Sequence, residues 1–139
     1  MKKVSIFLAE GFEEVEALTP ADLLRRAGAE VTLVSIGDKK EVAGSHGIII
    51  TADRLFVDTD FADADLLILP GGMPGTLNLK ACDPLLELLK EHNARGRNWL
   101  PSAPRLQFWA MPASWTASTP PATPAARTAS PEPSVRPPR

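Results

Sequence analysis

The sequence predicts an α/β fold built on a mostly parallel sheet, and three observations carry this prediction. Residues 3–8 and 66–69 are short apolar runs, of the kind that form strands buried on both faces. Helical patterns alternate with strand patterns along the chain, which is typical of parallel sheets with right-handed crossovers. Turn residues close the strands, most clearly Pro70, Gly71 and Gly72 after the second run.

The first half of the chain alternates between strands and a helix. After the strand at 3–8, residues 13–27 place apolar side chains at three- and four-residue spacing, which predicts an amphipathic helix. We expect Pro20 to kink or split this helix. A second strand follows at 31–36, and the glycines and isoleucines of residues 42–52 predict a small hairpin.

The second half of the chain first continues this alternation of strands and helices and then departs from it. The strand at 66–69 is followed by a helix that ends near Gly96, with Asp83 as its N-cap and Pro84 in its first turn. This order demands a further strand after the helix. Residues 99–104 contain two prolines, which exclude a central strand there. The fold is therefore predicted to be truncated after its third main strand.

Charge and composition exclude several classes of function. The formal net charge is −2 and the sequence has no basic stripe, so no nucleic-acid partner is expected. No run resembles a membrane span or a signal peptide, so we expect a cytoplasmic protein without a membrane partner. Cys82 is the single cysteine, and the two histidines, His46 and His92, are expected on the surface, so no metal site is predicted.

The composition changes abruptly near residue 98. All nine glycines lie at or before Gly96, whereas all three tryptophans and most of the 14 prolines follow it. Prolines at this density interrupt helices and strands alike. We therefore expect residues 1–98 to be the ordered part, and residues 99–139 to be a Pro-rich, disordered tail.

Three segments of the ordered part resemble the ThiJ/PfpI family. They are EGFEEVE at residues 10–16, PADLLRRAG at residues 20–28 and LPGGMPG at residues 69–75. The resemblance covers residues 1–98 and implies the N-terminal part of such a domain. It points to the Parkinsonism-associated protein deglycase group, within the class I glutamine amidotransferase-like superfamily. The fold that it implies is a flavodoxin-like three-layer sandwich that forms homodimers.

The resemblance also implies a chemistry and a set of site residues. Family members look like cysteine-dependent glyoxalases, protein deglycases or oxidative-stress chaperones, acting on small reactive carbonyl compounds or glycated proteins without a cofactor. Glu16 matches the carboxyl that supports the thiol, and Gly71 and Gly72 match the loop whose amides face the thiol. This assignment is physically sensible, because a protonated carboxyl can donate to a thiolate and backbone N–H groups can hold an oxyanion.

The nucleophile that the family pattern requires is missing. The family has a segment like Ala-Ala-Ile-Cys-Ala after the position of Asn98, and this chain has no cysteine there. Cys82 lies before the predicted helix, where we interpret it as an incidental small residue. Regrouping the possible codons from Trp99 onward permits Ala-Ala-Ile-Cys-Ala and then Val-Leu-Gly-His-Ala-Gly-Leu-Leu-Asp-Gly. We therefore hypothesise that one base was lost near Asn98 or Trp99, and that residues 99–139 are read out of frame.

Three functions remain open from the sequence. The first is the family enzyme, which is expected to be inactive as written because the nucleophile is absent. The second is a non-catalytic fragment that binds a partner or dimerises. The third is a flavodoxin-like ligand-binding domain, although Gly71, Gly72 and Gly75 lack the spacing of a nucleotide-binding loop.

Overall fold

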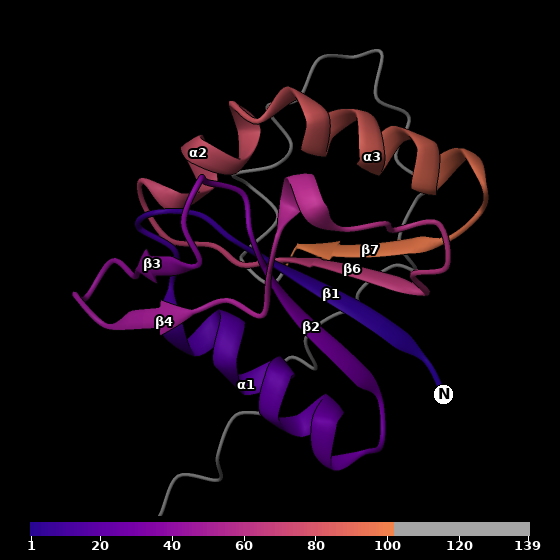
Figure 1. Ribbon diagram of the computed structural model, residues 1–139, viewed down its shortest axis with the longest axis horizontal. Coiled ribbons are helices and arrows are strands. Elements are labelled where there is room, and N and C mark those ends of the chain that lie inside the picture. The colour runs from indigo at the N-terminus through magenta and orange to yellow at the C-terminus, as the bar shows by residue number, and fades with distance from the viewer. Residues whose placement is uncertain (102–139) are drawn as a thin grey trace, which may run out of the picture.

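The main sheet has five parallel strands in the order β5-β2-β1-β6-β7 (Figure 1). The structure is a computed structural model, and it describes residues 1–101. The strands are β1 (Lys3–Leu8), β2 (Glu30–Ser35), β5 (Arg54–Leu55), β6 (Leu66–Leu69) and β7 (Asn98–Pro101). The parallel sheet predicted from the apolar runs is thus confirmed, with β1 at its centre.

Helices cover both faces of this sheet and complete a three-layer sandwich. Helix α1 (Glu14–Arg26) lies on one face, and α2 (Gly75–Lys80) and α3 (Asp83–Ala94) lie on the other (Figure 1). A short 3-10 helix, η1 (Phe56–Asp58), follows β5. This arrangement confirms the flavodoxin-like α/β architecture. Among residues 1–101, no helix has the length and apolar character needed to cross a membrane.

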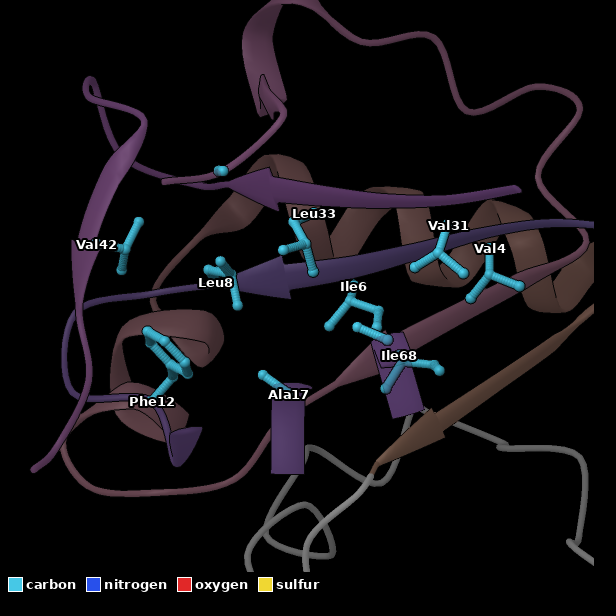
Figure 2. Packing of buried hydrophobic residues seen from close by; sticks show 11 residues of the cluster. Val4, Ile6, Leu8, Phe12, Ala17, Val31, Leu33, Val42 and Ile68 are labelled. Atoms are coloured by element: carbon cyan, nitrogen blue, oxygen red, sulfur yellow. The ribbon is translucent and has the colours of Figure 1, made fainter. Parts of the chain in front are cut away.

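Alternation along β1 divides the core into two clusters. Val4, Ile6 and Leu8 point to the side of α1 and belong to the same core cluster as its buried Ala17 (Figure 2). Phe7 points to the opposite face, into a cluster that includes side chains of α2 and α3. Because side chains alternate between the two faces of a strand, a central strand that is apolar throughout must be covered on both sides.

The predicted hairpin is present as a separate two-stranded sheet. Strand β3 (Glu41–Ala43) pairs antiparallel with β4 (Ile49–Thr51). The hairpin lies beside the carboxyl end of β1 and the start of α1 (Figure 1). Its Val42 is buried in the same core cluster as Ile6, so the hairpin is packed onto the body of the fold.

Strand β7 extends the sheet further than the sequence predicted. Residues Asn98 to Pro101 pair in register with Leu66 to Leu69, so one more strand follows the third main strand. Among residues 1–101, β7 lies at the edge of the sheet, a position where a proline such as Pro101 is tolerated. The sheet thus continues three residues past the predicted boundary at 98. The rest of the Pro-rich tail lies outside the described residues.

Two local predictions differ from the structure, and one short helix was not predicted. Helix α1 is not split at Pro20, which lies inside one continuous helix. Asp83 is the first residue of α3 rather than its N-cap, a position that Cys82 occupies. The short helix α2 was not predicted, since its six residues carry too little periodic pattern to stand out from the preceding loop.

The order of the strands determines where a site can form. The chain runs from β1 outward to β2 on one side, and later places β6 on the other side of β1. In open parallel sheets, ligands bind beyond the carboxyl ends of the strands where this reversal occurs. The loops that follow β1 and β6 are therefore the natural place to look.

Candidate functional site

The loops after β1 and β6 are joined by direct backbone hydrogen bonds. The Glu13 N–H donates to the Gly71 carbonyl at 2.8 Å, and the Gly75 N–H donates to the Gly11 carbonyl at 3.1 Å. The two segments are about 60 residues apart in sequence but meet at neighbouring strand ends. Together they form one hydrogen-bonded corner at the carboxyl edge of the sheet.

Glu16 reaches this corner from the first turns of α1. Its Oε2 accepts a hydrogen bond from the Gly71 N–H at 2.7 Å, and its side chain is half-buried. The structure therefore brings together Glu16 and Gly71, two of the residues that the family resemblance singled out. The Gly71 N–H is thus already hydrogen-bonded in this structure, with the Glu16 carboxylate as its acceptor.

Glycine is required where the two loops touch. Gly72 has a φ of +96°, and a Cβ at this position would lie 2.5 Å from the Glu13 nitrogen. A Cβ on Gly75 would lie 2.7 Å from the Phe12 Cα. Real Cβ atoms do not approach other atoms so closely, and an L side chain at such a φ is strained. Gly72 and Gly75 therefore allow the two loops to pack closely, and Gly72 also allows the turn itself.

A second carboxylate near this corner was missed by sequence reasoning. Glu14 is only 4% exposed, and its Oε1 accepts hydrogen bonds from the backbone N–H groups of His46 at 2.8 Å and Ile48 at 3.4 Å. Its Oε2 lies 3.0 Å from the His46 Nδ1. The helical spacing could have predicted that Glu14 is buried. Glu14 lies three residues before Ala17 and seven before Ala21, and both alanines are on the buried face of α1.

The surroundings of Glu14 and His46 favour their charged forms. Burial alone raises the pKa of the Glu14 carboxyl, but the hydrogen bonds from His46 and from nearby backbone N–H groups outweigh this and lower it to about 2. The pKa of His46 is raised above its usual value by its hydrogen bond with Glu14 and by the negative charges of Glu13 and Glu14. At mildly acidic pH the two side chains therefore form an ion pair.

The surface position predicted for the two histidines is confirmed for His46 and wrong for His92. His46 is exposed, with 67% of its side chain accessible, but it is engaged with Glu14. His92 is buried, so its surface assignment is wrong. It lies on the inner face of α3 with Leu85 and Leu89, its Nε2 is 3.0 Å from the Asn98 carbonyl, and burial lowers its pKa. Its contact with Asn98 makes it a structural residue that fixes the start of β7.

The remaining candidates for chemistry are Cys82 and the group formed by Glu13, Glu14 and His46. Cys82 is half-buried and packs against the core cluster on the α2 and α3 side, whereas Glu16 belongs to α1 on the other face. Glu13, Glu14 and His46 place their potential ligand atoms within 4.8 Å of one another. The Glu14 oxygens already accept hydrogen bonds from the hairpin, and we assign no metal site to this group.

Comparisons with known proteins agree on one family. Residues 2–99 match the model of the DJ-1/PfpI family. The chain is 44% identical over 96 residues to Protein DJ-1 homolog B of Arabidopsis thaliana, a match that covers 69% of this chain and 22% of that protein. It is 35% identical over 95 residues to the Parkinson disease protein 7 homolog of Danio rerio, covering 68% and 50%.

The solved structures give the same result. Oxidized DJ-1 of Toxoplasma gondii is similar with a TM-score of 0.70 and 37% sequence identity, and the match covers 73% of this chain and 55% of that one. The chain thus spans half or less of the length of the two curated relatives, and about half of the length of this structure.

The contact between the loops predicts a difference between two glycine substitutions. Gly72→Ala and Gly28→Ala both place an L side chain at positive φ, but a Cβ on Gly28 meets nothing within 4 Å. Gly28→Ala is expected to lower the free energy of unfolding by about 1–2 kcal/mol. Gly72→Ala should cost a further ~1–3 kcal/mol because it also forces the loops apart. Urea titration of both variants measures the difference, and equal losses would show that the loops are not in close contact in solution.

Proposed function

The chain belongs to the DJ-1/PfpI family, and we propose that residues 1–98 supply one half of a thiol-dependent site for small reactive carbonyl compounds. The observation that carries this proposal is the 2.7 Å hydrogen bond between the Gly71 N–H and the Glu16 carboxylate. It places a carboxyl group and a glycine turn together at the carboxyl end of β6, next to the end of β7. This is where a cysteine on a turn after β7 would meet both.

Each half of such a site has a defined chemical role. A thiolate adds to the carbonyl carbon of an aldehyde or ketone, forming a C–S bond and leaving the negative charge on the former carbonyl oxygen. Backbone N–H groups of the glycine turn can stabilise this oxyanion, and a protonated Glu16 can donate to the thiolate. In this chain, Glu16 and Gly71 instead satisfy each other.

The nucleophile is the part that we propose is lost. Cys82 is the only cysteine of the sequence, and its packing on the α2 and α3 side separates it from Glu16. The Ala-Ala-Ile-Cys-Ala segment permitted by the alternative reading frame would overlie the end of β7 and the residues that follow it. We therefore propose that residues 99–139 arose from the loss of one base, and that the chain as written does not turn over carbonyl substrates.

Activity measurements test this proposal directly. The chain as written is expected to consume no methylglyoxal above the buffer rate, whereas a version with the reading frame restored should consume it. Replacing the restored cysteine with serine should abolish that turnover. The proposal is wrong if the chain as written is active and Cys82→Ser removes the activity. Sequencing the coding DNA tests the frame itself, since an intact gene that encodes this tail would contradict the loss of a base.

A second proposal, that the chain associates with another copy of itself, is favoured by a specific surface. Val15 of α1 and Ile49 of β4 are each 67% exposed, and Ile48 is 52% exposed. Val15 follows Glu14 in α1, and the Ile48 N–H donates to Glu14, so these exposed apolar side chains belong to the segments that meet at the junction of α1 and the hairpin. Exposed apolar areas of this kind commonly mark protein–protein contacts. The family resemblance implies a homodimer, and we propose this face for it.

Sedimentation equilibrium of matched variants tests the proposed dimer. The unmodified chain is expected to sediment as a dimer at micromolar concentration, and Ile49→Lys should give a monomer because it places a charge in the apolar interface. Val57→Lys provides the control, since Val57 is 81% exposed and lies on η1, outside this face. A monomeric unmodified chain, or equal effects of both substitutions, would contradict the proposed interface.

A further inference from the structure

Besides the packing of Val42 in the core, backbone hydrogen bonds join the turn end of the hairpin to the body of the protein. Strands β3 and β4 form a sheet of their own, separate from the five-stranded sheet. At the tip of the hairpin, the Gly11 N–H donates to the Ala43 carbonyl, and the Ser45 N–H donates to the Phe12 carbonyl, both at 2.8 Å. The tip, residues 44–48, therefore lies directly against the loop that follows β1.

Glu14 is the side chain that fastens this tip. Its carboxylate is buried beneath residues 44–48 and accepts the His46 and Ile48 N–H groups, which are 32 and 34 residues away in the sequence. Gly44 has no side chain, and a Cβ there would overlap the Glu14 carboxylate. The backbone of the tip is thus wrapped around a buried negative charge, which is costly unless every contact to it is maintained.

The imidazole of His46 supplies the matching positive charge. Its Nδ1 lies 3.0 Å from Glu14 Oε2, 3.5 Å from Glu13 Oε1 and 3.1 Å from the Ser45 hydroxyl. Glu10, from the loop after β1, also faces the hairpin and accepts the Ala43 N–H at 3.4 Å. The ionisable side chains that contact the hairpin from α1 and from this loop are therefore carboxylates, and His46 is the cation that contacts Glu13 and Glu14.

We propose that Glu14 and His46 form a proton-controlled latch, which holds the hairpin tip against α1 while His46 is protonated and loosens it when His46 loses its proton. A neutral imidazole can still donate one hydrogen bond, but bonds between charged partners are roughly twice as strong as neutral ones. Loss of the positive charge also leaves the neighbouring carboxylates of Glu13 and Glu14 without their cationic partner. The latch does not depend on the proposed carbonyl chemistry.

The direction of the pH dependence follows from both groups. The pKa of His46 is raised in the folded chain, so its contribution is complete below its ordinary value of 6.5 and is lost as the pH rises through the raised value. The pKa of Glu14 is lowered to about 2, so its contribution is complete above 4.5 and is lost only toward pH 2. The tip should therefore be held most firmly between pH 4.5 and 6.5.

Hydrogen exchange of the full chain, corrected for the intrinsic effect of pH, measures the latch. The protection of the Ser45, His46 and Ile48 amides should fall about three- to tenfold between about pH 6 and 8.5, a change expected from losing the charge of one hydrogen-bonded pair. The amides of Ile6 and Leu8 in β1 serve as the internal reference, because their protection should not change with the ionisation of His46.

Two variants and one control variant test whether Glu14 and His46 cause the pH dependence of the tip. His46→Gln, a change at an exposed side chain, should lower the protection of the tip at pH 6 and remove its pH dependence. Glu14→Gln should lower the protection of the His46 and Ile48 amides at every pH and return the pKa of His46, followed by NMR, toward its usual value. Glu41→Gln, on the exposed side of β3, should behave like the unmodified chain. Constant protection in the unmodified chain, or pH dependence that survives in His46→Gln, would overturn the proposal.

Discussion

The contact between the loops after β1 and β6 is the constraint on which the rest of the site depends. The Glu16 carboxylate and the Gly71 N–H bind each other across 55 residues of sequence, and the Glu13 N–H binds the Gly71 carbonyl. Both amide and carbonyl of Gly71 are thereby fixed by the start of α1. A helix that packs through Ala17 on β1 thus determines the position of the turn after the neighbouring strand.

The same short segment supports the hairpin. Residues 10–16 follow β1 and begin α1, and they contact two other parts of the chain. Gly11 and Phe12 bind the hairpin backbone, and Glu14 lies beneath the hairpin tip. Glu16 binds the turn after β6. The acids of this segment are therefore not interchangeable. Glu14 is buried and contributes to folding, whereas Glu16 is half-buried at the edge where chemistry is proposed.

Sequence patterns determined the parts of the fold in which one local signal dominates. Strand β6 was predicted to the residue, because an uninterrupted apolar run ended by Pro70 permits few alternatives. The burial of Glu14 and His92 was not predicted, because it depends on partners that tertiary structure brings together: the hairpin tip in one case and Asn98 in the other. Strand β7 was underestimated because a proline is tolerated at the edge of a sheet.

For the site, the sequence indicated Glu16 only through the family motif and Gly71 and Gly72 also as the turn after a buried strand, and the structure adds the bond between Glu16 and Gly71. The exchange rate of the Gly71 amide in Glu16→Ala tests this bond most directly, with Val15→Ala, one residue earlier on the exposed face of α1, as the control. Removing the acceptor should speed exchange of this amide by about tenfold or more, the loss expected for a bond to a charged group. Unchanged exchange in Glu16→Ala would contradict the account, because it would show that the carboxyl does not hold the turn.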